Sequence, residues 1–449
     1  MSGINPFKGK LWIVGVLLAL AAYSIGLAVG PRVSGDALSA KSAWGVNCLT
    51  AIDLPGPFGL LLNCDSPDFM ESASKPERLV EKGNWRQNRP GQIWLAWLVS
   101  QPLKAMTDAF VSFASRADVQ LPEGNKRSRA QAIADLAPGF VAYYLLNLLL
   151  LVATIAVLRS NASLVGLNPT VFTLVASVLL FNDITKAYLL TPHSQLMNVF
   201  LPTLLVTLVF RGLRQVQFTR DQLLTLAAVS GLGLLVYATW ALVPVVMALW
   251  MASGLLQNSR RAAVLPALRW SPVLALLVFG PYVCWYAYVV QRTGSFYVHE
   301  TSYDGGLVWL LRLGAMEAAN RFVGNIAYLL GAAAAQSFPY IAMSLPAVLV
   351  LTIRRRSNGA DDNGALKQAF VAAALIGLLY LIFFALLGFR LWRYAVPLLP
   401  ALALPIAMIN CRAVQGFVSN TAKTRYLWLL ACIGAGIALF EVTKEGPWG

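Results

Sequence analysis

The chain has 449 residues, of which 58% are hydrophobic and only 12% are charged, and its mean hydropathy is +0.64. A soluble domain carries roughly 25% charged residues, and a globular core cannot bury so large a share of apolar side chains. The composition therefore excludes an ordinary soluble protein. It predicts a single integral membrane domain over residues 1–449.

The net charge of +15 raises the question of nucleic-acid binding. The basic residues, however, lie in short clusters between apolar stretches, as at 211–220, 260–269 and 354–356. This distribution is typical of cytoplasmic loops under the positive-inside rule. No basic stripe alternates with aromatic residues as on a nucleic-acid-binding face. We therefore expect contact with membrane lipids and no nucleic-acid partner.

The apolar runs predict an all-α, polytopic transmembrane helix bundle of about eleven spans, because about 20 apolar residues cross the hydrocarbon layer. The first run, 11–30, is too long for a signal peptide and lacks a well-placed cleavage site, which favours an uncleaved helix. The later helices are expected at 139–158, 166–182, 194–210, 222–238, 240–256, 270–290, within 322–353, and at 369–388, 394–410 and 426–441. Pro339 and Pro346 should divide or kink the segment 322–353.

Lys8 and Lys10, which precede the first helix, place the N-terminus in the cytoplasm, and eleven spans then leave the C-terminus outside. In this orientation the cytoplasmic segments carry more than twice as many Lys and Arg residues as the short outer segments and the tail, as the rule requires. We expect a multi-pass protein of the inner (plasma) membrane. Its sizeable extracytoplasmic loops are 31–138 and 291–320.

The loop 31–138 is more than a linker. Its later part, from Gln92 to Phe113, is apolar but has four polar, charged or proline interruptions. These favour juxtamembrane helices lying in the interface over a full span, although two extra spans would preserve the downstream orientation.

Two of the five cysteines, Cys48 and Cys64, fall in this loop. A disulfide between them is possible if the loop faces an oxidising compartment. The alternative is two free, buried thiols.

Motifs of soluble enzymes are absent from the sequence: it has no phosphate-binding Gly-rich loop ending in Gly-Lys-Ser/Thr, no His-Glu-x-x-His and no Cys-x-x-Cys. The polar residues of interest gather instead on the expected outer face. Asp36 comes first, a few residues beyond helix 11–30. A carboxylate at the membrane surface suits a general base that deprotonates a hydroxyl acceptor. The alternative is a solvated loop carboxylate or a helix N-cap.

Further acids in the same loop are Asp53, Asp65, Asp68 and Glu71. The spacing of Asp65 and Asp68 would place two carboxylates on one helical face, with an ordinary loop as the alternative.

Two pairs of arginines are candidates for binding a phosphate. Arg86 and Arg89 lie three residues apart beside the interfacial apolar stretch, where guanidinium groups suit a phosphate at headgroup depth; the alternative is nonspecific contact with anionic lipid. Arg390 and Arg393, followed by Tyr394, lie at the outer mouth of the helix expected at 394–410. The positive-inside rule disfavours arginine there, so either the pair binds the phosphate of a lipid-linked substrate or the side chains snorkel to the interface.

The expected hairpin between 166–182 and 194–210 adds Asp183, Lys186 and His193 to the same face as candidate substrate-binding residues. His299 and its acidic neighbours lie in the loop 291–320. A metal site built from these His, Asp and Glu side chains is possible, with solvated loop residues as the alternative.

Three motifs, taken in order, resemble the GT-C class of membrane glycosyltransferases. Gly35-Asp36 with the following stretch 37–45 is similar to the acidic motif after the first helix. Asn88-Arg89-Pro90-Gly91 resembles the Arg-Pro segment that leads into juxtamembrane helices. Arg393-Tyr394 with Pro397 and Pro400 is similar to the Arg-Tyr…Pro…Pro helix near the end of many members. The order of parts matches over most of the chain.

The resemblance implies a transferase that moves a sugar from a polyprenyl-phosphate donor to a glycan or lipid acceptor of the cell envelope, with inversion. Asp36 would activate the acceptor, and Arg393, together with Arg89, would hold the donor phosphate. No cofactor is firmly implied, and a divalent metal is possible. The alternative is a transporter or flippase for a lipid-linked glycan, which should carry ionisable residues in broken or repeated helices.

Overall fold

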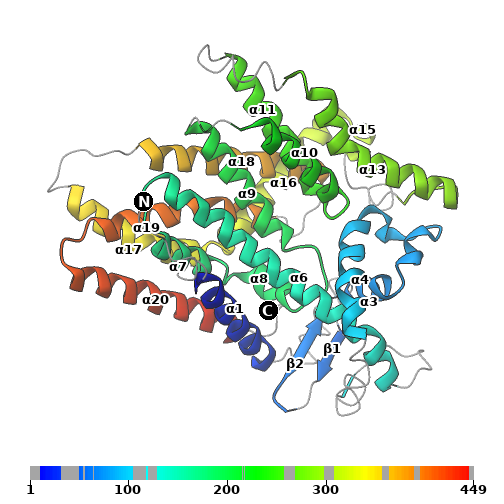
Figure 1. Ribbon diagram of the computed structural model, residues 1–449, viewed down its shortest axis with the longest axis horizontal. Coiled ribbons are helices and arrows are strands. Elements are labelled where there is room, and N and C mark those ends of the chain that lie inside the picture. Colours follow the sequence, from blue (N-terminus) through cyan, green and yellow to red (C-terminus); the bar gives the residue numbers. More distant parts are fainter. Residues whose placement is uncertain are drawn as a thin grey trace.

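The computed structural model describes residues 11–31, 50–53, 56–63, 65–104, 118–119, 129–214, 216, 218–256, 268–297, 308–355, 364–388 and 395–443. Within these ranges the chain is nearly all helical and forms the expected bundle (Figure 1). The helices of the bundle are α1 (Leu11–Val29), α6 (Arg129–Leu164), α7 (Pro169–Leu179), α8 (Asp183–Leu189), α9 (Met197–Leu213), α10 (Arg220–Leu234), α11 (Leu242–Leu256), α13 (Ser271–Thr293), α16 (Ala315–Ala335), α17 (Phe338–Arg355), α18 (Gly364–Leu387), α19 (Ala403–Gln415) and α20 (Asn420–Thr443). The shorter elements are α3 (Ser66–Ser74), α4 (Pro90–Lys104), α15 (Val308–Arg312) and the 3-10 turns η1 (Pro76–Val80), η2 (Trp85–Asn88), η3 (Ala238–Ala241), η5 (Val396–Leu398) and η6 (Pro400–Leu402).

Five described helices are long and apolar enough to cross a membrane: α1, residues 136–164 of α6, α13, α18 and α20. Two further pairs of helices are long and apolar enough only when the two helices of the pair are counted as one span. They are α7 with α8, bent by 73°, and α16 with α17, bent by 63°. Helix α9 and the stretch 238–252 are apolar but shorter. Length and composition thus support five to seven spans in the part of the chain described. The membrane character of the protein is supported, and the count of eleven stays a prediction.

Prolines shape two of the expected helices. The segment 322–353 is divided at Gln336 and Ser337, shortly before Pro339, as predicted. The prediction of a regular helix over 394–410 is wrong for its first part. From Val396 to Leu402 the chain forms 3-10 turns, and the α-helix starts only at Ala403, because proline lacks the N–H that an α-helix interior needs.

A small three-stranded sheet in the first loop corrects the all-α expectation. The strand β1 (Thr50–Asp53) pairs antiparallel with β2 (Gly59–Leu62), with Thr50 opposite Leu62, and with β3 (Asp118–Val119) on its other side. The two apolar runs are only four residues long and flank a Pro-Gly-Pro sequence. Gly56 there has a φ of 78°, which glycine adopts without strain. This turn signal is the feature that could have predicted the hairpin.

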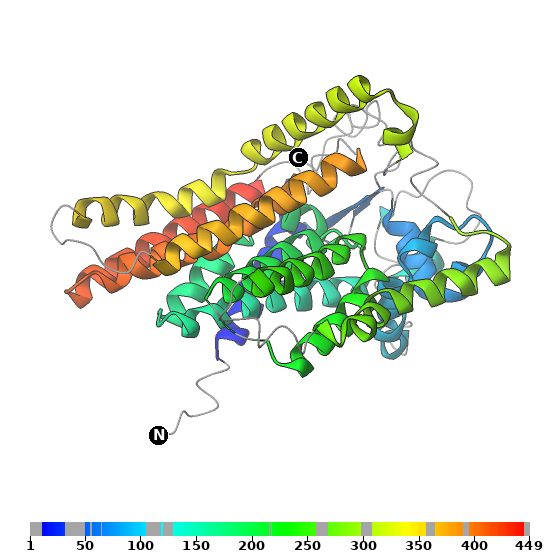
Figure 2. The same cartoon turned by 90° about the horizontal axis from the view of Figure 1, so that it is seen from above.

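The first loop packs onto the bundle through a core of its own. Helices α3 and α4 lie beside the N-terminal part of α6 in both views (Figures 1 and 2). The buried side chains that join them are Phe69, Ala73, Leu79, Ile93, Ala96, Ala142, Tyr143, Leu235, Trp285 and Val289, from α3, η1, α4, α6, the end of α10 and α13. The opposite face of α4 is apolar and exposed, with Leu98 57% exposed. An apolar helix packed on the bundle with one free apolar face agrees with the expected juxtamembrane position. Helix α6 begins at Arg129, so the loop ends before residue 138.

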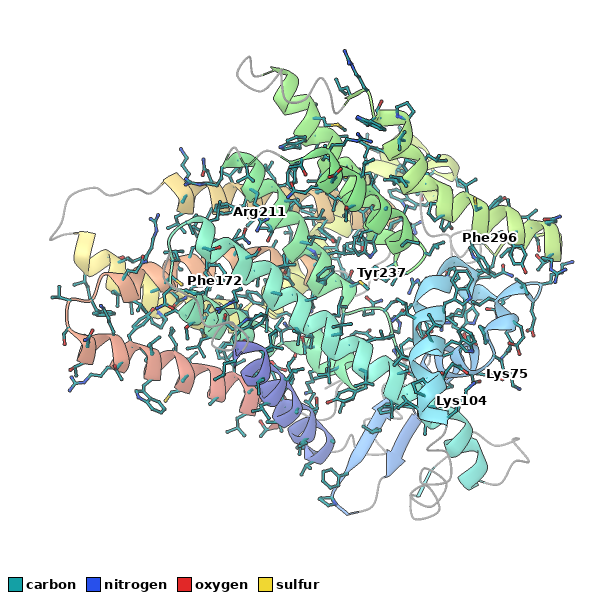
Figure 3. All side chains as sticks on the ribbon, in the orientation of Figure 1. Lys75, Lys104, Phe172, Arg211, Tyr237 and Phe296 are labelled. Atoms are coloured by element: carbon teal, nitrogen blue, oxygen red, sulfur yellow. The ribbon has the colours of Figure 1, made fainter. Side chains whose placement is uncertain are left out.

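Contacts group the helix ends into two sets. At one end, Arg159 Nη1 donates to Thr173 Oγ1 (2.6 Å) and its guanidinium lies 5.2 Å from the Trp12 ring. Arg211 Nη2 donates to Ser160 Oγ (2.9 Å) in the same region. Figure 3 shows Arg211 well separated from Lys75 and Lys104, which belong to the first loop at the other end. The start of α1, the end of α6, the start of α7 and the end of α9 therefore lie together.

Gly231 allows α10 and α13 to approach closely. A Cβ there would overlap the carbonyl oxygen of Leu277. We predict that Gly231→Ala lowers the free energy of unfolding by about 1–3 kcal/mol, because a backbone carbonyl cannot rotate away as a side chain can. Thermal unfolding in detergent measures the effect.

Gly377→Ala in α18 is the matched control, since a Cβ there meets nothing within 4 Å. It should be neutral or slightly stabilising. Equal destabilisation by both substitutions would contradict the close α10–α13 packing.

Candidate functional site

The site is built around the start of α3. Asp65 is the N-cap residue, and Pro67 lies in the first turn, where its missing N–H costs nothing. Asn63 Oδ1 accepts from the Asp65 N–H (3.0 Å) and from Ser66 Oγ (2.6 Å). The Asp65 carboxylate makes no capping bond to its own helix, unlike most N-cap aspartates. It turns outward instead.

Arg86 binds the carboxylates of both Asp65 and Asp68. Its Nη2 lies 3.1 Å from Asp65 Oδ1 and its Nε 2.7 Å from Asp68 Oδ2. The guanidinium also stacks on the rings of Phe69 and Trp85, at 3.9 and 4.1 Å from their centroids. The Arg86 side chain is 5% exposed, whereas Asp65 and Asp68 are 20% and 24% exposed. The charge of Arg86 is thus neutralised inside the loop, and the carboxylates reach the surface.

Backbone anchors fix Arg86 in place. Asn84 caps η2 by accepting the Arg86 N–H (2.8 Å). The next residue, Gln87, is fully buried; its carbonyl accepts from Trp285 Nε1 (2.7 Å), and its Oε1 accepts from the Tyr297 N–H (2.9 Å). Helix α4 is then held by the Gly91 N–H, which donates to the Leu235 carbonyl (2.9 Å). Four segments distant in sequence converge here.

His193 brings the α8–α9 connection to Asp65. The imidazole is 1% exposed and packs against the Phe69 and Tyr188 rings. The Gln195 N–H donates to His193 Nδ1 (3.2 Å), so Nδ1 carries no hydrogen. The hydrogen therefore sits on Nε2, which donates to Asp65 Oδ2 (3.0 Å). His193 orients the carboxylate and is not itself placed as a base.

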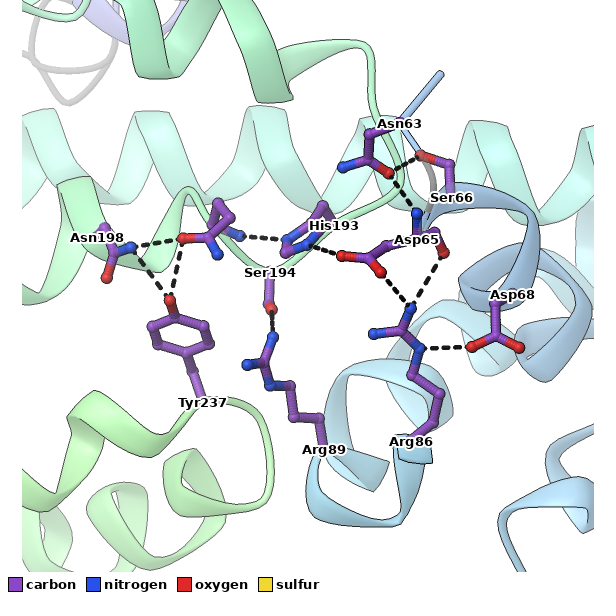
Figure 4. Close-up of polar contacts among 11 residues, drawn as sticks. Asn63, Asp65, Ser66, Asp68, Arg86, Arg89, His193, Ser194, Asn198 and Tyr237 are labelled. Atoms are coloured by element: carbon purple, nitrogen blue, oxygen red, sulfur yellow. Dashed lines mark hydrogen bonds and ion pairs between the residues drawn. The ribbon is translucent and has the colours of Figure 1, made fainter. Parts of the chain in front are cut away.

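Arg89 lies next to this group (Figure 4). Its Nη1 donates to Ser194 Oγ (3.1 Å), and its guanidinium lies 5.0 Å from the Tyr237 ring. Within the part of the chain that the structure describes, Arg89 pairs with no carboxylate, in contrast to Arg86. Its link to the Asp65 group runs through Ser194, the residue after His193.

A buried polar network holds Tyr237, whose ring contacts Arg89. Tyr237 Oη and Asn198 Nδ2 both donate to Gln195 Oε1, at 3.0 and 2.6 Å. On the α6 side, Asn147 Nδ2 donates to the carbonyls of Tyr188, Leu189 and Thr191. Tyr188 and Leu189 belong to the last turn of α8 and Thr191 follows it, where helix carbonyls need partners from outside the helix. The connection that carries His193 is thereby fixed on both sides.

The structure separates the predicted site residues. It brings Arg86, Arg89 and His193 together with Asp65. Asp183, half-buried, lies at the other end of α8 in a different cavity, and Lys186 is buried within α8. Several predicted residues lie outside the described residues: Asp36, Cys48, Cys64, His299, Arg390, Arg393 and Tyr394.

Sequence reasoning ranked the key residue too low. Asp65 was weighed only as an alternative to Asp36, and its alignment with Asp68 was rated below an ordinary loop. The sequence Asp-Ser-Pro-Asp is a helix-start signal that could have raised its rank. The contribution of Tyr237 was missed, because nothing in the sequence links residue 237 to residue 89.

A divalent metal does not fit this acid pair. Asp65 and Asp68 both direct an oxygen at the Arg86 guanidinium, which takes the place that a bridging cation would need. Among the described residues, no three His, Cys, Asp or Glu side chains are grouped to hold a metal ion.

Comparisons with known proteins found no match. No family model, no curated protein and no solved structure is significantly similar to this chain. The function has to be argued from the site itself.

We predict that Arg86→Ala destabilises the first loop strongly, by about 2–4 kcal/mol, because it leaves two acids beside a buried gap without their cation. Thermal unfolding in detergent and faster amide hydrogen exchange over 65–104 would report the loss.

Arg78→Ala is the matched control. Arg78 also contacts two acids of this loop, Glu71 (2.6 Å) and Glu81 (3.5 Å), but it is 29% exposed. It should cost about 0–1 kcal/mol. A similar loss from both substitutions would show that Arg86 is an ordinary surface ion pair.

Proposed function

We propose that this protein is a membrane glycosyltransferase of the GT-C type, which moves a sugar from a polyprenyl-phosphate donor to a cell-envelope acceptor at the outer face. The observation that carries the proposal is the Asp65 carboxylate. It is one-fifth exposed, held by two donors from different segments, and linked to Arg89 through the neighbouring residues His193 and Ser194. A fixed carboxylate next to a cation is what transfer from a phosphate-linked donor to a hydroxyl needs.

Asp65 acts as the general base in this proposal. It accepts the proton of the acceptor hydroxyl while the acceptor oxygen attacks the anomeric carbon of the donor. The bond from that carbon to the phosphate oxygen breaks, and the polyprenyl phosphate leaves with the electron pair. Attack opposite the leaving group inverts the anomeric carbon. Asp36, which the family resemblance favours, is the competing candidate for the same role.

Arg89 holds the departing phosphate. Its guanidinium is oriented by Ser194 and by the Tyr237 ring, and a guanidinium binds phosphate oxygens in a fixed fork geometry. Arg86 is a positioning residue for Asp65. Arg393, with Arg390 and Tyr394, would complete the phosphate site as the resemblance implies.

The proposed orientation places this site outside the cytoplasm. The basic residues Arg159, Arg211 and Arg220 belong to the end of the bundle away from Asp65, and the positive-inside rule assigns that end to the cytoplasm. Counting each bent pair as one span, and adding the shorter helices α9, α10, α11 and α19 to the five long ones, gives the eleven-span topology. The N-terminus is then cytoplasmic, and the C-terminus extracytoplasmic.

A transporter or flippase for a lipid-linked glycan is the second candidate. Two helices are broken, between α7 and α8 and between α16 and α17. Two ionisable residues, Lys186 and Glu441, are almost fully buried, at 3% and 2% exposed. Broken helices with buried ionisable groups are typical of transporters.

We predict that Asp65→Asn reduces sugar transfer about 10²- to 10⁴-fold while the protein folds normally, because the amide keeps the shape of the carboxylate but cannot accept the proton. Mass spectrometry of envelope glycans and polyprenyl-phosphate sugars would measure this in a deletion strain carrying each variant. The donor should accumulate and one sugar should be missing.

Asp68→Asn is the control, since it also removes an Arg86 partner but leaves His193 and Asp65 paired. It should retain most activity. Loss of transfer in Asp36→Asn, with normal transfer in Asp65→Asn, would assign the base to Asp36. A complete glycan that accumulates inside the cell would favour the flippase.

We also predict that Arg89→Gln weakens binding of polyprenyl phosphate about tenfold or more, because a charge-assisted hydrogen bond is lost. Titration of the purified protein with polyprenyl phosphate, which carries no sugar, tests this apart from catalysis. Arg78→Gln, on the same loop, should bind as the wild type does. Unchanged affinity in Arg89→Gln would remove Arg89 from the phosphate site.

A further inference from the structure

A second polar region lies where two broken helices meet the end of α20. It is a cavity of about 230 Å³. Its polar lining comes from Asp183 at the start of α8, Gln336 between α16 and α17, and Glu441 near the end of α20. Ala335, Phe338, Pro339 and Phe440 form the rest of the wall. None of these residues touches the Asp65 site.

The interior of the cavity is acidic. Glu441 is 2% exposed, and Asp183 is half-buried. Lys186, three residues along α8 from Asp183, is buried and is not part of this lining. An acidic interior disfavours a phosphate group.

Tyr23 of α1 adds an independent observation. Its side chain is buried, and its hydroxyl has no hydrogen-bond partner among the described residues. The Tyr23 ring packs against Phe181, two residues before Asp183, with 4.7 Å between the ring centroids. A buried hydroxyl rarely stays without a partner. The chain near Asp183 therefore holds a buried donor that a bound polar group can satisfy.

The wall of the cavity is apolar on its outer side. The Phe338 and Phe440 rings lie 5.7 Å apart, and they are 54% and 47% exposed. Their neighbours on the same helices, Ile341 and Leu439, are exposed as well. Such an apolar surface on a membrane helix faces lipid. The cavity therefore opens toward the hydrocarbon layer, with its polar groups inside.

We propose that this cavity binds the neutral, hydroxyl-rich headgroup of a membrane lipid, with the lipid tail lying along Phe338 and Phe440. Carboxylates accept hydrogen bonds from hydroxyls, an amide both donates and accepts, and the Tyr23 hydroxyl donates. The volume of about 230 Å³ far exceeds the space that a single water needs, which suits one headgroup of a few polar groups. The identification of this lipid as the sugar acceptor rests on the proposed function, whereas the binding itself does not.

Native mass spectrometry of the protein released from lipid nanodiscs tests the proposal. The nanodiscs contain phosphatidylcholine with a small share of glucosyl-diacylglycerol, diacylglycerol, stearylamine or phosphatidic acid. The wild type should retain glucosyl-diacylglycerol in preference to the other three. The double variant Asp183→Asn with Glu441→Gln should lose this retention about tenfold or more, since hydrogen bonds to charged acceptors are removed.

Two further variants make the result specific. Ala335→Phe fills the cavity without changing its charge and should lose retention as well. Glu317→Gln changes an exposed acid in the first turn of α16 and should behave as the wild type does. Equal retention in all variants, or a preference for stearylamine or phosphatidic acid, would overturn the proposal. Asp65→Asn should still retain glucosyl-diacylglycerol, so a failed glycosyltransferase assignment would leave this result intact.

Discussion

The rest of the site depends on the ion pairs that Arg86 makes with Asp65 and Asp68. Burying a guanidinium is unfavourable unless acids and aromatic faces replace its water, and this loop supplies two acids and two rings. The same constraint turns Asp65 away from capping its own helix. Because its second oxygen then meets His193, the pairing that stabilises the loop also joins the loop to the bundle.

The apolar composition explains why polar chemistry is found only in certain places. A helix within the bilayer satisfies its own backbone, and its side chains have no water to bind. Larger groups of polar side chains therefore lie at helix ends and at breaks, while single ones within helices bind a partner, as Asn147 does. The Asp65 site follows the end of α8, where Asn147 binds the exposed carbonyls, and the cavity with Glu441 lies at the break between α16 and α17.

Sequence predicted the parts of the fold that follow from local composition. The apolar runs identified most helices, and Pro339 predicted the division before α17, because each depends on neighbouring residues alone. The contact of Asp65 with His193 spans 128 positions and has no local signal. Arg86 and Arg89 illustrate the same limit. The sequence predicts that both arginines bind phosphate, because their side chains are identical and lie three residues apart. Only the fold reveals that the charge of Arg86 is neutralised by two acids.

The region around Asp65 and Arg89 and the cavity lined by Asp183 and Glu441 differ in charge, and this difference favours different ligands. Arg89 provides a cation without an acidic partner in the described chain, bound to the segment that also pairs with Asp65, the proposed base. The described lining of the cavity at the other end of α8 provides two carboxylates and no basic side chain. A phosphate is attracted to the first and repelled by the second, whereas a neutral hydroxyl-bearing headgroup is accepted by carboxylates in either place. A donor lipid and an acceptor lipid that share the same apolar tails can therefore be distinguished by headgroup charge alone. Helix α8, seven residues or about 10 Å long, joins Asp183 at the cavity to the segment that carries His193, so under the two proposals the acceptor lipid and the base contact opposite ends of the same short helix.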